Sequence, residues 1–134
     1  MIVVDTSAVV AIFRQEEDAA NHADAIAADS DPVMSAASVV EASLVLRGLK
    51  RVAPEIAESW LDTFLAAAGI RIEPVTLEQA ALARSAHIRF GKGNGQGANL
   101  NYGDCFSYAR AQALRAPLLA KGSDFPRTDV RLVL

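Results

Sequence analysis

Acidic residues at four separated points of this 134-residue sequence could combine into one reactive site. At an effective dielectric constant of 20, two carboxylates about 4 Å apart repel by about 4 kcal/mol, so a cluster of them needs bound protons or a cation. Carboxylate oxygens without clustered His or Cys are typical ligands of Mg²⁺ or Mn²⁺. Such an ion lowers the pKa of bound water and stabilises charge on a phosphate, which indicates phosphodiester hydrolysis. The four residues are Asp5, Glu41, Asp104 and Asp124.

Each acid also has an ordinary structural interpretation. Asp5 and Asp104 could each serve only as a helix cap. Glu41 could be a solvated helix residue, although its neighbours are apolar and an unpaired charge among them is costly. Asp124 could belong to a turn, and Asp129 is a rival for its role. Their joint positions, after predicted strands or at the start of the helix before the fourth strand, favour one shared site.

Short apolar segments alternate with helical patterns along the chain. This order favours parallel strands joined by right-handed crossovers, so it predicts a three-layer α/β/α sandwich with a central, mostly parallel sheet. Residues 1–134 fit a single domain. Ligands bind at the carboxyl ends of such strands, where Asp5 lies. Predicted strands are 2–4, 33–34, 70–75 (half-buried or at an edge), 117–120 and 130–133, and predicted helices are 7–14, 16–29, 35 or 38 to 46, 54–68, 76–90 and 103–114.

Capping residues set several of these helix starts. Ser7 is predicted to cap the first helix, and either Ser35 or Ser38 the third, with Gly48 beyond its end. Thr76 begins a Thr-x-x-Gln capping box.

The segment 91–101 contains four glycines and three asparagines, which predicts a flexible loop. Residues 93–98 match the dinucleotide pattern G-x-G-x-x-A, but they follow a helix rather than a strand, so we reject that interpretation. The loop is either a mobile rim that lets a phosphate backbone approach or a slack surface connection.

Composition excludes several classes of protein. No apolar run reaches the ~18 residues of a membrane span, and the apolar start lacks the basic flank of a secretory signal, so we expect a cytoplasmic protein. Cys105 is the only cysteine, which rules out an intrachain disulfide and a cysteine metal site; we interpret it as a small residue near the core. The net charge of −3 argues mildly against a nucleic-acid binder, unless the acids are concentrated in a metal site.

Four basic residues are candidates for weak phosphate contacts, although a solvated surface position is the commoner role for each. Tyr102 could stack on a base or pack on the core. His22 and His87 lie in helical segments and are predicted to be surface residues that the proposed chemistry does not need. The basic candidates are Arg14, Lys92, Arg110 and Lys121.

Four motifs, spread from residue 1 to about residue 130, carry a resemblance to a known family. They are Met1-Ile-Val-Val-Asp-Thr-Ser-Ala, Ala37-Ser-Val-Val-Glu-Ala, Leu100-Asn-Tyr-Gly-Asp-Cys-Phe-Ser-Tyr-Ala and Pro117-Leu-Leu-Ala-Lys-Gly-Ser-Asp-Phe. The third is the most specific. On these motifs the chain resembles the PIN-domain nucleases, in particular the VapC-type toxins of bacterial toxin–antitoxin pairs.

This resemblance implies a PIN-like fold and a Mg²⁺-dependent endoribonuclease that cuts RNA in single-stranded or loop regions. Asp5 and Asp104 match the two acids most directly tied to the metal. Glu41 matches the third acid, Asp124 matches the fourth and most variable one, and Ser7 matches a hydroxyl that supports the first aspartate. The resemblance also implies a homodimer and a VapB-like antitoxin that holds the enzyme inactive by covering its site.

Other α/β classes fit less well. A phosphoacceptor receiver domain needs an aspartate at the end of its third strand, and 70–76 supplies none there. A haloacid-dehalogenase-type phosphatase needs a second acid at position 7, where this chain has Ser7. The remaining alternative is a catalytically silent PIN-like or receiver-like domain that acts through partner binding, which four intact acids disfavour.

Overall fold

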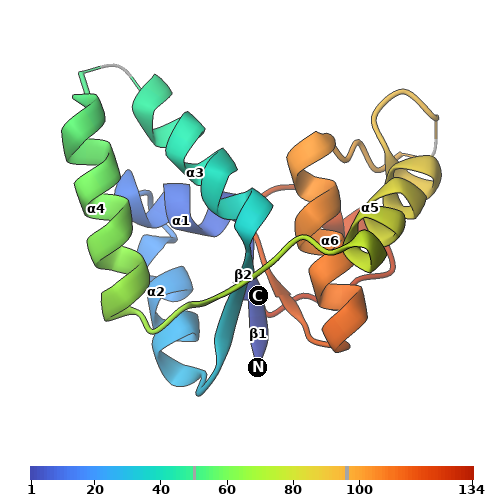
Figure 1. Ribbon diagram of the computed structural model, residues 1–134, viewed down its shortest axis with the longest axis horizontal. Coiled ribbons are helices and arrows are strands. Elements are labelled where there is room, and N and C mark those ends of the chain that lie inside the picture. Colours follow the sequence, from blue (N-terminus) through green and yellow to red (C-terminus); the bar gives the residue numbers. More distant parts are fainter. Residues whose placement is uncertain (50, 96) are drawn as a thin grey trace.

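A parallel sheet forms the middle layer of the protein (Figure 1). The computed structural model describes residues 1–49, 51–95 and 97–134, and within them the sheet has four strands in the order β3-β2-β1-β4. Strand β3 therefore lies at an edge, as predicted. The strands are β1 Ile2–Val4, β2 Pro32–Ser35, β3 Arg71–Glu73 and β4 Leu118–Leu119.

Helices cover both faces of this sheet, with α1 to α4 on one side and α5 and α6 on the other (Figure 1). The alternation of side chains along β1 explains both cores: Ile2 and Val4 pack against α1 to α4, whereas Val3 packs against α5 and α6. The predicted three-layer sandwich is confirmed. No helix in the described ranges is long and apolar enough to cross a membrane. The helices are α1 Thr6–Phe13, α2 Ala19–Ala28, α3 Ala36–Gly48, α4 Pro54–Ala67, α5 Leu77–Phe90 and α6 Tyr102–Leu114.

The helix caps differ in part from prediction. Asp5, not Ser7, caps α1, because its side chain accepts a hydrogen bond from the Ser7 backbone N–H. Ser35 rather than Ser38 caps α3, and Gly48 is the last residue of that helix instead of lying beyond it. Thr76 caps α5 as predicted, by accepting a hydrogen bond from the Gln79 N–H, whereas the Gln79 side chain donates to the Ala109 carbonyl (3.3 Å).

The predicted strand 130–133 is wrong. A single parallel bridge joins Leu118 to Leu132, with hydrogen bonds from the Leu118 N–H to the Arg131 carbonyl (2.8 Å) and from the Val133 N–H to the Leu118 carbonyl (3.0 Å). Strand β4 has only two residues, so it offers too short an edge for a fifth strand to pair along.

The glycine-rich loop follows α5 directly, which supports rejecting a dinucleotide site. Its ends are joined, since the Lys92 N–H donates to the Leu100 carbonyl (2.9 Å) and the Leu100 N–H to the Phe90 carbonyl (3.0 Å). The Arg127 guanidinium also donates to the Gly97 carbonyl (3.1 Å). The loop is thus tied to the fold at several points, in contrast to a slack connection; Gln96 within it lies outside the described residues.

Candidate active site

A pocket of about 300 Å³ lies at the carboxyl end of β1. Three of the four predicted acids line it, delivered by different elements: Asp5 follows β1, Glu41 lies in α3 and Asp104 in the first turn of α6. The predicted convergence of these three is therefore confirmed by the geometry. The remaining lining residues are Thr6, Ser7, Val10, Arg14, Glu16, Val45, Asn101 and Lys121.

Asp5 is only 2% exposed, and both oxygens of its carboxylate are held. Oδ2 accepts hydrogen bonds from the Ser7 N–H (2.9 Å) and the Ser7 hydroxyl (2.6 Å), while Oδ1 accepts one from the Ser107 hydroxyl (2.5 Å). Asp5 thus caps α1 and also lines the pocket. Ser7 supports it, as the resemblance implied.

Ser107 holds Asp5 through this hydrogen bond, a contact that the sequence did not predict. It is fully buried, and its Oγ also lies 3.1 Å from Oγ of Ser38 in α3. Ser107 comes three residues after Asp104 on the same helix, a spacing that puts both side chains on one face. That spacing is the feature of the sequence that could have identified Ser107.

Glu41 is half-buried, and its carboxylate lies against Gly103 at the start of α6. A Cβ atom at Gly103 would overlap this carboxylate. Burial raises the pKa of Glu41, and the charge of Asp5 raises it further, while a hydrogen bond with the Thr6 side chain lowers it. The close approach of α6 to Glu41 therefore depends on glycine.

Asp104 belongs to a capping box with Asn101. The Asn101 N–H donates to Oδ2 of Asp104 (3.0 Å), and the Asp104 N–H donates to Oδ1 of Asn101 (2.9 Å). Burial raises the pKa of the Asp104 carboxyl to about 7, although the Asn101 hydrogen bond opposes this. The negative charges of Asp5, Glu41 and Asp124 also raise it, which means that all four predicted acids are near enough to interact.

Asp124 lies beside the pocket without lining it. It directly precedes a short 3₁₀ helix, η1 Phe125–Arg127, and its charge acts on Asp104. Its rival Asp129 is engaged elsewhere, since it accepts hydrogen bonds from the side chains of Tyr108, Gln112 and Arg89. Asp124 is therefore the better candidate for the fourth acid.

The carboxylates fit a hard divalent cation in their chemistry. All are oxygen donors, and their mutual repulsion is the condition that a cation relieves. As they stand, no three His, Cys, Asp or Glu side chains in residues 1–49, 51–95 and 97–134 converge closely enough to coordinate one ion. An ion would have to draw these side chains together.

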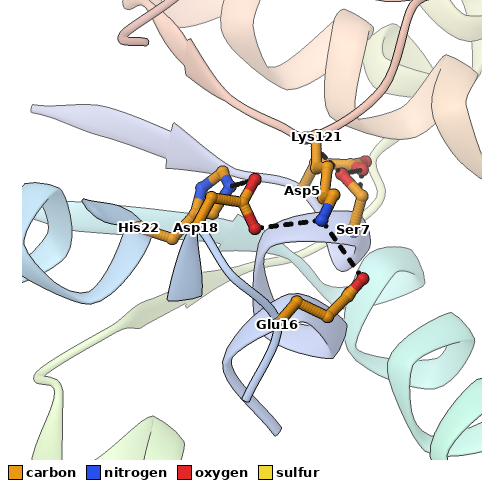
Figure 2. A network of polar contacts seen from close by, with 6 residues as sticks. All are labelled: Asp5, Ser7, Glu16, Asp18, His22 and Lys121. Atoms are coloured by element: carbon orange, nitrogen blue, oxygen red, sulfur yellow. Dashed lines mark hydrogen bonds and ion pairs between the residues drawn. The ribbon is translucent and has the colours of Figure 1, made fainter. Parts of the chain in front are cut away.

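The four basic candidates have different positions. Arg14 is exposed and lines the pocket, whereas Lys92 is exposed in the glycine-rich loop and does not line it. Lys121 lines the pocket with its ammonium paired to Glu16 and Asp18 (Figure 2).

Arg110 contradicts its prediction. It is 7% exposed and donates to the Pro74 carbonyl (2.8 Å), so it is a structural residue inside the fold rather than a phosphate contact.

The predictions for the two histidines, Tyr102 and Cys105 had different outcomes. His22 is buried, at 2% exposure, and its Nε2 lies 3.2 Å from Oδ2 of Asp18, so the surface prediction was wrong for it; His87 is exposed as predicted. Tyr102 is 80% exposed with its ring edge-on to Phe106, which contradicts packing on the core. Cys105 is buried as predicted, and burial raises the pKa of its thiol to about 11.

We expect the stability of the ion-free protein, relative to an Asp104→Asn variant, to fall as the pH rises from about 4 to about 7. An unfolded Asp titrates near 3.8, whereas Asp104 in the folded protein keeps its proton to about 7. The folded state therefore binds more protons in this window, and raising the pH favours unfolding. Thermal denaturation in EDTA, followed by circular dichroism, measures the effect. Parallel pH profiles for the two proteins would contradict it.

Known proteins resemble this chain both in sequence and in fold. The PIN domain profile matches residues 2–131. Ribonuclease VapC28 of Mycobacterium tuberculosis is 47% identical over 133 residues, which cover 99% of this chain and 98% of the relative. Among solved structures, Mycobacterium tuberculosis VapC20, described as a sarcin-ricin loop cleaving toxin, has a TM-score of 0.78 at 18% identity, covering 99% of this chain and 98% of that one. VapBC2 from Rickettsia felis, bound to a DNA fragment from its promoter, has a TM-score of 0.72 at 19% identity, covering 98% and 96%.

Proposed function

The chain belongs to the PIN-domain family, and from that premise we propose that it is a metal-dependent endoribonuclease, the toxin of a toxin–antitoxin pair that its antitoxin holds inactive. One observation carries this proposal. Asp5, Glu41 and Asp104 come from three separate elements and line one pocket. A silent, partner-binding domain would have no need to keep mutually repelling carboxylates together.

Asp5, Glu41 and Asp104 would hold Mg²⁺ or Mn²⁺, with Asp124 beside them to complete the charge of the site. When bound, the ion supplies an activated water molecule and stabilises the charge that builds on the phosphate.

The protein's own contribution is to orient two of the carboxylates, Asp5 and Asp104, before an ion binds. Ser7 and Ser107 hold both oxygens of Asp5, so that side chain has a single orientation. The capping box fixes Asp104 at the start of α6. Arg14 offers positive charge at the same pocket, where it can offset the repulsion between the acids and an RNA phosphate.

We also propose an RNA substrate cut in single-stranded or loop regions, a homodimer, a VapB-like antitoxin as partner, and action in the cytoplasm. The antitoxin receives support from VapBC2 of Rickettsia felis, the toxin–antitoxin system whose structure shares this fold. Co-expression with the product of a neighbouring small gene, followed by co-purification, tests that partner.

Removing divalent cations is expected to reduce RNA cleavage to background, and Mg²⁺ or Mn²⁺ to restore it. The reason is that the carboxylates alone have no group that polarises water or stabilises the phosphate charge. Cleavage of a labelled single-stranded RNA, before and after treatment with EDTA and after adding back each ion, measures this. Cleavage that is indifferent to chelation would rule out the metal mechanism.

A further inference from the structure

A cluster of charges lies near Asp5 and Ser7, on the side of the α1–α2 turn (Figure 2). The Lys121 ammonium is 3.2 Å from Oε1 of Glu16 and 2.9 Å from Oδ1 of Asp18. These side chains are between 30% and 38% exposed, so the cluster is open to solvent. Lys121 and Glu16 also line the pocket that contains Asp5 and Asp104.

The backbone of Lys121 is fixed relative to the acidic centre. Its N–H donates to the Ser7 hydroxyl (2.8 Å), and that hydroxyl donates to Oδ2 of Asp5 (2.6 Å). The main chain of Lys121 is thus two hydrogen bonds from the Asp5 carboxylate, and only its flexible four-carbon side chain is free to choose partners.

We propose that Lys121 binds an RNA phosphate beside the acidic centre, and that Glu16 and Asp18 hold its ammonium until RNA replaces them. This inference rests on the proposed ribonuclease function. A phosphate at the pocket competes for the same ammonium, and exposed ion pairs contribute so little to stability that exchanging partners is easy. The alternative role of the cluster is to hold the α1–α2 turn in place. Exposed ion pairs are too weak to do this well.

Asp18 keeps a partner after such an exchange. Its second oxygen, Oδ2, lies 3.2 Å from Nε2 of the buried His22. Asp18 therefore stays in place when Lys121 leaves, ready to take it back after the product dissociates.

The first test measures how strongly RNA binding depends on salt. An Asp5→Asn background, with Mg²⁺ present, keeps the RNA uncut, and fluorescence anisotropy of a labelled single-stranded RNA gives the affinity at several salt concentrations. Each phosphate contact contributes about 0.7 to the slope of log affinity against log salt for single strands. We expect Lys121→Met to lower the slope by about 0.7 and Lys121→Arg to preserve it.

Arg71 provides a matched control. It is an exposed cation that also pairs with two carboxylates, Asp31 and Glu73, but it lies at the start of β3, at the opposite end of the sheet. Arg71→Met should leave the slope unchanged. An equal slope for the parent and Lys121→Met, or a parent that does not bind RNA, would overturn the inference. The measurement involves no cleavage, so a failure of the proposed nuclease activity would be seen separately.

A second variant distinguishes phosphate binding by Lys121 from a purely structural role, in which its ion pairs hold the α1–α2 turn in place. Glu16→Gln releases Lys121 from one of its holders, so we expect tighter RNA binding in the same background. The structural role predicts weaker RNA binding instead, because the α1–α2 turn would lose an attachment. Weaker binding by Glu16→Gln would therefore overturn the inference.

Discussion

Replacing Asp5 by Asn is expected to reduce RNA cleavage by at least about 10³-fold, while the protein stays folded. Asp5 is the acid with the least freedom, since Ser7 and Ser107 hold both its oxygens. Removing its charge removes an ion ligand, and the loss of about 4 kcal/mol of transition-state stabilisation corresponds to a factor of about 10³ in rate. Cleavage of a labelled RNA under single-turnover conditions measures the change.

The fold should survive this substitution because Asn caps a helix as well as Asp does. Its amide oxygen can accept from the Ser7 N–H, and its amide nitrogen can donate to the Ser107 hydroxyl. Asp129→Asn is the matched control: Asp129 is an acid outside the pocket, bonded to Tyr108 and Arg89, and its variant should cleave at close to the normal rate. Normal cleavage by a well-folded Asp5→Asn protein would overturn the assignment of this site.

Replacing Gly103 by Ala is expected to lower cleavage by about 10- to 100-fold, the range typical for residues that orient metal ligands. The added methyl group would overlap the Glu41 carboxylate. Because that carboxylate is the end of a flexible side chain, it can move away from the added methyl group. The substitution should therefore impair the site without destabilising the fold. Alanine also favours a helix over glycine by up to about 1 kcal/mol, so stability should not fall.

Gly48→Ala is the control for this variant. Gly48 also lies in a helix, and no atom would approach its added Cβ within 4 Å. It gains the same helix preference without touching the site, so its activity should be unchanged. Equal cleavage rates for the two alanine variants would contradict the role given to Gly103.

The three-layer arrangement, and the meeting of three of the four acids at one pocket, could be predicted from the sequence. Strands and helices alternate clearly, and parallel strands place their carboxyl ends at one edge of the sheet, so the sequence predicts that Asp5, Glu41 and Asp104 lie close together. Their motifs are local, and each lies at the start of a helix or within its first turns.

The sequence could not predict contacts that form only when helices and strands pack against one another. Ser107 reaches Asp5 because α6 packs on the sheet, and the buried Arg110 donates to the Pro74 carbonyl, which follows β3. His22 looked like a surface residue in a polar helix, but α2 turns it inward. Helical spacing alone does not say which face of such a weakly amphipathic helix is buried.

The hydrogen bond from Ser107 to Asp5 spans 102 residues, and the one from Lys121 to Ser7 spans 114. Strand β1 is synthesised well before β4, yet the two strands pair. Ribosomes add about 5–20 residues per second, so roughly 5 to 20 s separate the synthesis of Asp5 from that of Ser107. A growing chain therefore carries an incomplete centre until α6 and β4 have been synthesised, and the proposed ribonuclease site cannot assemble before then.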